Sequence, residues 1–211
     1  MKHTIFAAAL ALASISAAHA DAINGLYNTG LGASGSADAY YSLSSAVSST
    51  AYTSTEAAWP INDGTWLHNT ETSKWITPLL DQAQTLDPSV DGTYTYKLSF
   101  DLTGYNASTA SFTGHFAADN AVTIKLNGTD IASGVGFSSW QDFSASSGFV
   151  AGQNSLEFVV TNYRQGSGNP TGLRVEFSES NITAVPEPET YAMLVGGLAL
   201  VGAIARRRKQ K

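Results

Sequence analysis

Apolar and polar side chains alternate along the middle of the chain. In residues 93–102 every second position is apolar, and the positions between them hold Thr, Lys, Ser or Asp. The apolar positions are Tyr94, Tyr96, Leu98, Phe100 and Leu102. A period of two places these side chains on one face of an extended segment, so the pattern predicts a half-buried antiparallel strand.

Four more segments have strand character, and short polar pairs separate them. The segments are residues 111–116, 122–126, 156–161 and 173–177. Asn127-Gly128 predicts a tight hairpin, because a type I′ turn needs positive φ at both central residues. Asp91-Gly92 and Asp119-Asn120 are typical of further turns.

The rest of the central region gives weaker signals. Residues 31–58 are rich in Ser, Thr and Ala and indicate two irregular strands, whereas a helical period is visible over residues 78–86 alone. Short strands with Gly and Asn turns favour an all-β domain over residues 21–184, built as an antiparallel two-sheet sandwich or jelly roll.

The first twenty residues have the composition of a secretory signal peptide. Lys2 precedes an apolar run over residues 5–15, and Ala18-His19-Ala20 forms a cleavage site of small residues. The apolar run is too short to span a membrane, so we predict cleavage before Asp21 and delivery by the general secretion machinery.

The other end of the chain combines a proline-rich hexapeptide (185–190), an uncharged stretch (191–205) and a basic tail (206–211). A helix over the uncharged stretch would reach ~22 Å against a hydrocarbon core of ~30 Å, which makes it a short transmembrane helix. The positive-inside rule keeps the tail in the cytoplasm and the β domain on the far side of the membrane. The residues of this topology anchor are Arg206, Arg207, Arg208 and Lys209.

This three-part end closely resembles the PEP-CTERM sorting signal of Gram-negative bacteria. The motif residues are Val185, Pro186, Glu187, Pro188 and Glu189. The resemblance implies that exosortase, a membrane-embedded protease, recognises the Pro-Glu-Pro segment and releases or transfers the protein, in species that make exopolysaccharide. Two prolines hold the segment extended, as a protease cleft requires. An ordinary C-terminal anchor behind a chance Pro-Glu-Pro linker remains the alternative.

A second resemblance covers residues 90–178. The strand that ends in Asn127-Gly128, followed by the Gly-x-Asn-x-Leu strand that begins at Gly152, is similar to galactose-binding-domain-like jelly rolls. The matching positions are turn and core residues, so this resemblance implies the fold and leaves the ligand open.

Charge and cysteine content exclude several classes of function. Residues 21–190 hold 17 acidic and five basic side chains, a net charge of −12. This balance argues against binding to nucleic acid or to anionic membrane surfaces. The chain has no cysteine, which excludes disulfides, thiolate metal sites and cysteine nucleophiles.

No enzyme motif is present, and we expect a non-enzymatic protein. His68 and His115 are the histidines that remain after signal cleavage, and they lack metal-ligand spacing. A glycosidase needs two carboxylates about 5–9 Å apart, and the scattered acids single out no such pair. A secreted glycoside hydrolase therefore stays the second alternative.

Sugar binding is the first alternative, because exposed aromatic rings stack on pyranoses and polar side chains bind hydroxyls. The candidate sugar contacts are Trp66, His68, Tyr163 and Arg164. Trp66 follows a turn-like segment, and Tyr163 and Arg164 lie in the long polar loop 162–170. No cofactor is predicted. A structural calcium ion, held by Asn62 with Asp63 or by Asp119, Asn120 and Asp130, remains an alternative.

The sequence as a whole indicates an exported protein of the cell surface or extracellular matrix that is associated with exopolysaccharide and biofilm. Its precursor would cross the inner membrane, be anchored there transiently, and then be processed by exosortase. The partners expected are exosortase, the secretion machinery and exopolysaccharide.

Overall fold

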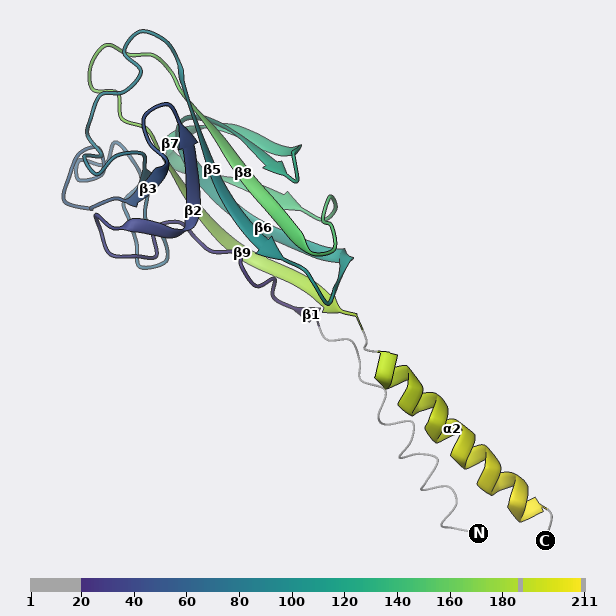
Figure 1. The fold of residues 1–211 in the computed structure, drawn as a ribbon. Helices are drawn as coiled ribbons and strands as arrows, with labels where there is room; N and C mark the ends of the chain where they lie inside the picture. Colours follow the sequence, from purple (N-terminus) through teal and green to yellow (C-terminus); the bar gives the residue numbers. More distant parts are fainter. Residues whose placement is uncertain (1–19, 186–187, 210–211) are drawn as a thin grey trace.

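The computed structural model describes residues 20–185 and 188–209. These form an all-β domain followed by one helix, α2 (Pro188–Lys209), which extends away from the strands (Figure 1). The strands are β1 (Ala20–Asp21), β2 (Ala37–Ser45), β3 (Thr50–Thr53), β4 (Ile76–Thr77), β5 (Gly92–Asp101), β6 (Tyr105–Leu126), β7 (Thr129–Ala145), β8 (Gln153–Asn162) and β9 (Gly172–Ala184). The predicted all-β class is confirmed.

The strands pair antiparallel in the order β1-β9-β4-β3-β2-β5-β8-β6-β7, and β9 also pairs with β6. The pairing of β9 with β6 closes seven of these strands into a ring, with β1 and β7 attached at its margins. The fold is therefore sandwich-like, and hydrogen-bonded strands join its two layers on both sides.

Strand β6 belongs to both layers because it changes partner along its length. Its first part pairs with β9 as far as Asp119, opposite Gly172, and its second part pairs with β8 from Ala121, opposite Thr161. The turn predicted at Asp119-Asn120 is wrong, since both residues lie inside β6. The polar pair marks the place where the strand passes from one layer to the other.

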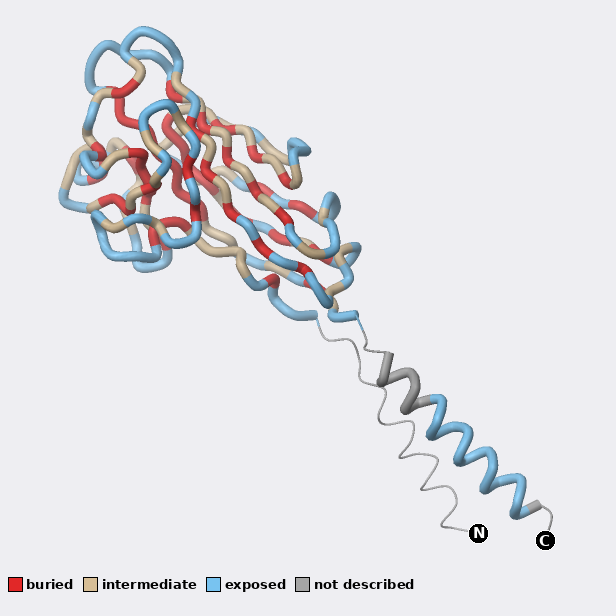
Figure 2. The backbone as a smooth tube through the Cα atoms, viewed as in Figure 1, coloured by how far each residue is buried: buried red, intermediate tan, exposed pale blue. Residues whose placement is uncertain are grey.

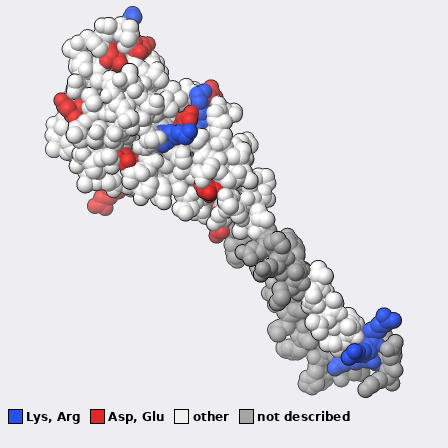
Figure 3. Space-filling model, in the orientation of Figure 1, with Lys and Arg blue, Asp and Glu red and all other residues white. Residues whose placement is uncertain are grey.

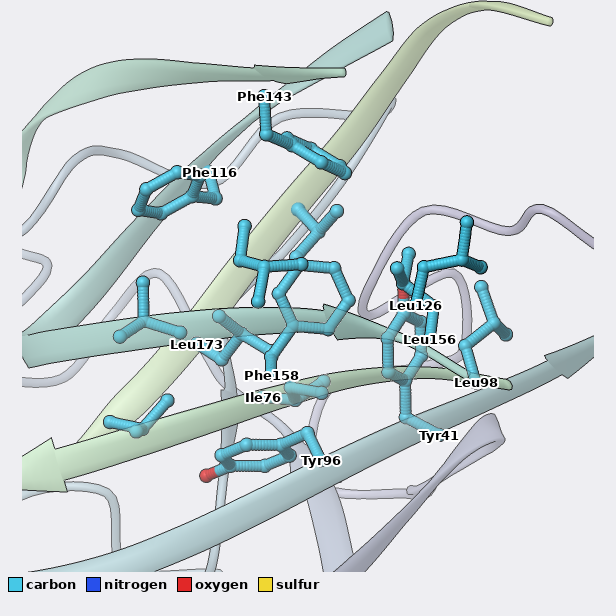
Figure 4. Packing of buried hydrophobic residues seen from close by; sticks show 14 of the residues in the cluster. Tyr41, Ile76, Tyr96, Leu98, Phe116, Leu126, Phe143, Leu156, Phe158 and Leu173 are labelled. Atoms are coloured by element: carbon cyan, nitrogen blue, oxygen red, sulfur yellow. The ribbon is translucent and has the colours of Figure 1, made fainter. Parts of the chain in front are cut away.

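The alternating apolar positions form the core between the layers, as Figure 2 shows by the red segments along most of the strands. All five apolar positions of residues 93–102 are buried. They pack with apolar side chains of the neighbouring strands, including Tyr41, Phe116, Phe143, Leu156 and Phe158 (Figure 4). The strand predictions for residues 111–116, 122–126, 156–161 and 173–177 are confirmed.

The hairpin predicted at Asn127-Gly128 joins β6 to β7. The φ angles are 50° at Asn127 and 83° at Gly128, as the type I′ turn requires. The Asn127 side chain also accepts the Ser155 backbone N–H at 2.9 Å and donates to the Gly148 carbonyl at 2.9 Å. It thereby fixes the turn against the start of β8.

Residues 31–58 contain β2 and β3, as predicted, but residues 78–86 form no helix. The buried Gln82 side chain binds the connection that follows β3 instead. Its Oε1 accepts the Thr55 N–H at 2.8 Å, and its Nε2 donates to the carbonyls of Thr55, Ala58 and Trp59 at 3.1–3.3 Å. Tertiary hydrogen bonds thus override the weak helical period.

The two ends of the chain meet the β domain close together (Figure 1). Ala20 and Asp21 pair with Thr183 and Ile182 of β9, whereas the other nineteen residues of the predicted signal peptide lie outside the described residues. The helix is longer than the predicted stretch 191–205. Among the described residues, no helix is both long enough and apolar enough to cross a membrane.

Candidate functional site

The sorting motif begins where the β domain ends. Strand β9 ends at Ala184, and the exposed Val185 follows, with its backbone N–H donated to the Gly104 carbonyl at 2.9 Å. Pro186 and Glu187 lie outside the described residues, and α2 begins at Pro188. Val185 thus lies directly after the last strand, whereas Pro188 and Glu189 lie in the first turn of the helix, so the prediction that this part of the motif is extended is wrong.

The predicted topology anchor lies at the far end of α2. Arg206, Arg207 and Arg208 are exposed, and the helix ends at Lys209. Figure 3 shows basic side chains gathered at this end, while charged side chains are sparse over the visible face of the β domain. The basic end of the helix matches the basic tail of the sequence.

Trp66 is a core residue, so its prediction as an exposed sugar contact is wrong. Its side chain belongs to the connection between β3 and β4, residues 54–75, and is 1% exposed. Its ring lies 4.4 Å from that of Trp75, and its Nε1–H donates to Asp119 Oδ2 at 2.9 Å. A Cβ on Gly172 would lie 2.9 Å from the Trp66 ring, so glycine is required there for this close packing.

The connection 54–75 covers the outer face of β6 and β9 and builds a second, smaller core there. Its members are Ile61, Trp66, Trp75 and Ala117. Trp75 is fully buried, and its Nε1–H donates to the Leu67 carbonyl at 2.8 Å. A segment with the composition of a loop therefore contributes the largest buried side chains of this face.

Asp119 is buried beneath this cover, with 5% of its surface exposed. Desolvation raises the pKa of its carboxyl to about 7, and the hydrogen bond from Trp66 opposes part of this shift. The Thr171 hydroxyl donates to the Asp119 backbone carbonyl. Asp119 therefore titrates near neutral pH at the point where β6 changes layers.

Asp119→Asn is expected to remove a pH dependence of stability. The folded state binds a proton at Asp119 up to a pH of about 7, while the unfolded chain releases it near its ordinary pKa of 3.8. Between these values the free energy of unfolding falls as pH rises, by ~1.4 kcal/mol per unit, and the contribution is gone above pH 7. At pH 8–9 the variant should exceed the parent by about 2–4 kcal/mol.

Urea unfolding of both proteins from pH 4 to pH 9 measures this difference. The difference curve isolates Asp119, because the other titrating groups are common to both proteins. Glu157→Gln is the matched control, because it removes a carboxyl from the outer face of β8, away from the connection 54–75. A flat curve for Asp119→Asn would contradict the assignment of a neutral, buried Asp119 carboxyl.

Arg174 is a second buried charge on the same face, with 2% of its surface exposed. Its guanidinium donates to Ser73 Oγ at 2.6 Å, to Thr70 Oγ1 at 3.0 Å and to Glu176 Oε1 at 3.1 Å, and also to the His68 carbonyl. The Trp140 ring centroid lies 4.7 Å from its Cζ. These contacts tie the connection 54–75 to strand β9.

Glu176 completes this buried cluster. Burial opposes its ionisation, but hydrogen bonds from Ser73 and His115, together with the charge of Arg174, lower the pKa of its carboxyl. His115 Nε2 lies 3.1 Å from Glu176 Oε2, and its ring lies 4.3 Å from that of Trp140. Each charged side chain of the cluster has an oppositely charged or polar partner, which is the arrangement of a structural ion pair.

The other three predicted sugar contacts, His68, Tyr163 and Arg164, lie on the surface. His68 Nδ1 lies 2.5 Å from Glu56 Oε1, and the His68 side chain is 63% exposed. Tyr163 is 48% exposed; its backbone N–H donates to Asn120 Oδ1 at 2.7 Å, and that of Arg164 to Asp91 Oδ1 at 2.9 Å. The structure thus leaves an exposed pair in the loop after β8, and His68 belongs to a different loop.

The two sets of calcium ligands considered from the sequence are not assembled. Asp63 Oδ1 accepts the Thr65 N–H at 2.9 Å in a local turn. Asp130, on β7, forms an ion pair with Lys125 at the hairpin end of β6. Asp119 lies further back along β6, where that strand changes layers. Within the described ranges, no group of three or more His, Asp or Glu residues is placed to hold a metal ion.

A groove that the sequence did not single out lies between β2, β3 and β5. It has a volume of about 370 Å³, and Tyr40 and Lys97 are among its lining residues. The alternation of residues 93–102 predicts that Lys97 lies on the outer face of its strand. No feature of the sequence indicates that Tyr40, and not another tyrosine, lines a groove. The irregular pairing of β2 and β3 that forms the groove is a tertiary feature.

Comparison with known proteins assigns the C-terminal segment. Residues 184–209 match the PEP-CTERM protein-sorting motif, which confirms the resemblance drawn from the sequence. The motif implies export, a membrane-anchored precursor and processing by exosortase. No curated protein matches the chain.

Two solved structures resemble part of the chain. One is a PA14 sugar-binding domain from an RTX adhesin, with 16% identity, a TM-score of 0.26 and coverage of 47% of this chain and 56% of that one. The other is a family 35 carbohydrate binding module from an environmental isolate, with 17% identity, a TM-score of 0.26 and coverage of 48% and 76%. The match thus spans little more than half of the PA14 domain. Neither likeness identifies a ligand for this chain.

Proposed function

We propose that this protein is a non-enzymatic component of the outer cell surface or extracellular matrix, where it associates with exopolysaccharide in a biofilm. It is exported with a cleaved signal peptide, held by its C-terminal segment and processed by exosortase. The observation that carries this proposal is the sorting motif at residues 184–209. This segment begins at the last residue of β9 and includes the helix α2, which ends with Arg206, Arg207, Arg208 and Lys209.

The position of the motif suits processing without loss of the fold. Strand β9 pairs with β1, β4 and β6 through residues that all precede Val185. The Val185 N–H makes one further hydrogen bond, to Gly104. A cut within residues 186–190 would therefore release the β domain with its ladder of hydrogen bonds intact.

The buried charges support a non-enzymatic role. A glycoside hydrolase would present two carboxylates to a cleft. Of the acids on the face covered by the connection 54–75, Asp119 is bound to Trp66, and Glu176 is bound to Arg174, Ser73 and His115. Both carboxyls therefore contribute to packing of the connection 54–75.

Replacing Pro186 and Pro188 together by Ala is expected to block processing while leaving export intact. The substitution removes two fixed φ angles and adds two backbone N–H groups at the positions that the protease would recognise. Cell fractionation and intact-mass analysis of the full chain, expressed in an exosortase-containing host, measure the result. The parent should give a mature form that begins at Asp21 and lacks the helix, and the variant should accumulate as a membrane-bound precursor that also begins at Asp21.

Two controls define this experiment. Pro88→Ala removes a proline from an exposed loop of the β domain and should be processed like the parent. Neutral residues at Arg206, Arg207, Arg208 and Lys209 should impair retention in the membrane, because the charge asymmetry that orients the segment is lost. Parent-like processing of the double proline variant would refute exosortase recognition, and a mature form that retains the first twenty residues would refute signal cleavage.

A carbohydrate-binding module is the second candidate function. The specific observation that favours it is the groove between β2, β3 and β5, which is lined by hydroxyl groups and an exposed tyrosine.

A further inference from the structure

The groove exists because β2 bows away from β3. Ala37 pairs with Tyr52 and Ser42 with Thr50, so that four residues of β2 face a single residue of β3. On its other side β2 remains in register with β5, where Ser42 lies opposite Lys97. The bulge therefore opens a hollow of about 370 Å³ without breaking the sheet.

The bulge is held rigidly by one carboxylate. Asp38 Oδ1 accepts the backbone N–H groups of Tyr40 and Tyr41 at 2.8 and 2.9 Å, and Oδ2 accepts that of Gly30 at 2.8 Å. The Tyr41 hydroxyl donates to the Tyr27 carbonyl at 2.7 Å. The groove is thus formed before any ligand arrives, which lowers the ordering cost of binding.

Tyr40 gives the groove an aromatic wall. It is 41% exposed, and its ring stacks on that of Tyr27 with centroids 3.8 Å apart and an interplanar angle of 22°. The stack fixes the ring and covers one of its faces. The accessible surface of Tyr40 therefore belongs to the opposite face and edge, where the apolar face of a pyranose would pack.

Apart from Ala39, Tyr41 and Ala51 the remaining lining is polar, and its two charged groups, Asp38 and Lys97, are opposite in sign. Ser42, Ser49, Thr50 and Ser99 supply hydroxyl groups. Lys97 Nζ lies 3.2 Å from Glu157 Oε1, outside the groove lining, and both oxygens of Asp38 already accept backbone N–H groups. Such a surface offers donors and acceptors to hydroxyls and no net attraction for an ionic ligand.

We propose that this groove binds a neutral hexopyranose polymer, with one ring on Tyr40 and hydroxyl groups bound by Lys97 and the serines. The proposal rests on the proposed association with exopolysaccharide and names its site and ligand class. A volume of about 370 Å³ lies within the range of small-ligand sites. Many copies on a surface would add avidity to the modest affinity of one shallow site.

Affinity electrophoresis of the full chain in mild detergent tests this site. The probes are a soluble glucan, a galactan and a mannan, with alginate as a uronate polymer for contrast. At least one neutral polymer should retard the parent. Tyr40→Ala should bind about tenfold more weakly, Lys97→Met should also bind more weakly, and Tyr40→Phe should retain binding because it keeps the ring.

Two matched controls lie outside the groove. Lys125→Met removes a lysine from the same sheet face, since Lys97 and Lys125 both lie opposite Glu157, and Tyr163→Ala removes an exposed tyrosine from the loop after β8. Both should bind like the parent, and near-ultraviolet circular dichroism should verify that every variant is folded.

The contrary outcomes separate the site from the function. Loss of binding in Tyr163→Ala with retention in Tyr40→Ala would overturn the groove and leave the association with polysaccharide standing. Retardation by alginate alone would overturn the neutral ligand class. No retardation by any polymer would overturn both the groove and the polysaccharide association, whereas export and processing are decided separately by the proline variants.

Discussion

Trp66→Ala is expected to lower the free energy of unfolding of the β domain by ~3–5 kcal/mol, because it removes a fully buried indole. The cavity would lie between Trp75 and the outer face of β6 and β9. The substitution also removes the Nε1–H donor that binds Asp119 Oδ2. Urea unfolding at pH 7, followed by circular dichroism, measures the loss as a lower midpoint.

Trp59→Ala is the matched control for this experiment. Trp59 lies in the same connection but is half-buried, so its removal should cost about 1 kcal/mol. Phe100→Ala, in the main core, provides a second reference with a loss similar to that of Trp66→Ala. Equal midpoints for Trp66→Ala and Trp59→Ala would contradict the burial of Trp66 beneath the connection.

The strands could be predicted because burial of one face of each strand in the main core requires apolar residues at every second position. A strand with one buried face must alternate, and residues 93–102 do so without exception. The hairpin at Asn127-Gly128 could be predicted for a similar reason, since its backbone conformation restricts the residue types locally. Both signals depend on near neighbours in the chain.

The second core could not be predicted, because it depends on where a distant segment folds. Alternation correctly places Arg174 and Glu176 on the outer face of β9, opposite the core residues Leu173 and Val175. It does not reveal that residues 54–75 cover this face. The turn-like sequence before Trp66 therefore suggested an exposed indole, whereas the connection carries it onto β6 and β9.

The candidate site divides in the same way between local and tertiary signals. The sorting motif is contiguous, so five residues and the segments after them were enough to identify it. The groove lies between β2, β3 and β5. It arises because four residues of β2 lie opposite a single residue of β3. A mismatch between paired strands leaves no periodic trace in either strand, which explains why Tyr40 was missed.

Arg174→Met is expected to cost about 3–5 kcal/mol, because it breaks a buried ion pair by removing one partner. Glu176 would keep its hydrogen bonds from Ser73 and His115 but would lose the nearby cation. The Thr70 hydroxyl and the His68 carbonyl would lose a donor. Arg174→Lys should recover part of the loss, since an ammonium restores the charge but cannot reproduce the planar fork.

Arg164→Met is the control for Arg174→Met, because it removes an exposed arginine whose side chain makes no hydrogen bond to another described residue. Its effect should stay within about 0.5 kcal/mol. Urea unfolding at pH 7 compares the three arginine variants with the parent, and limited proteolysis reports on the connection 54–75. If Arg174 secures this connection, Arg174→Met should be cut within residues 54–75 faster than the parent. Equal stability and equal cleavage for the Arg174→Met and Arg164→Met variants would show that packing of Trp66 and Trp75 alone holds the connection in place.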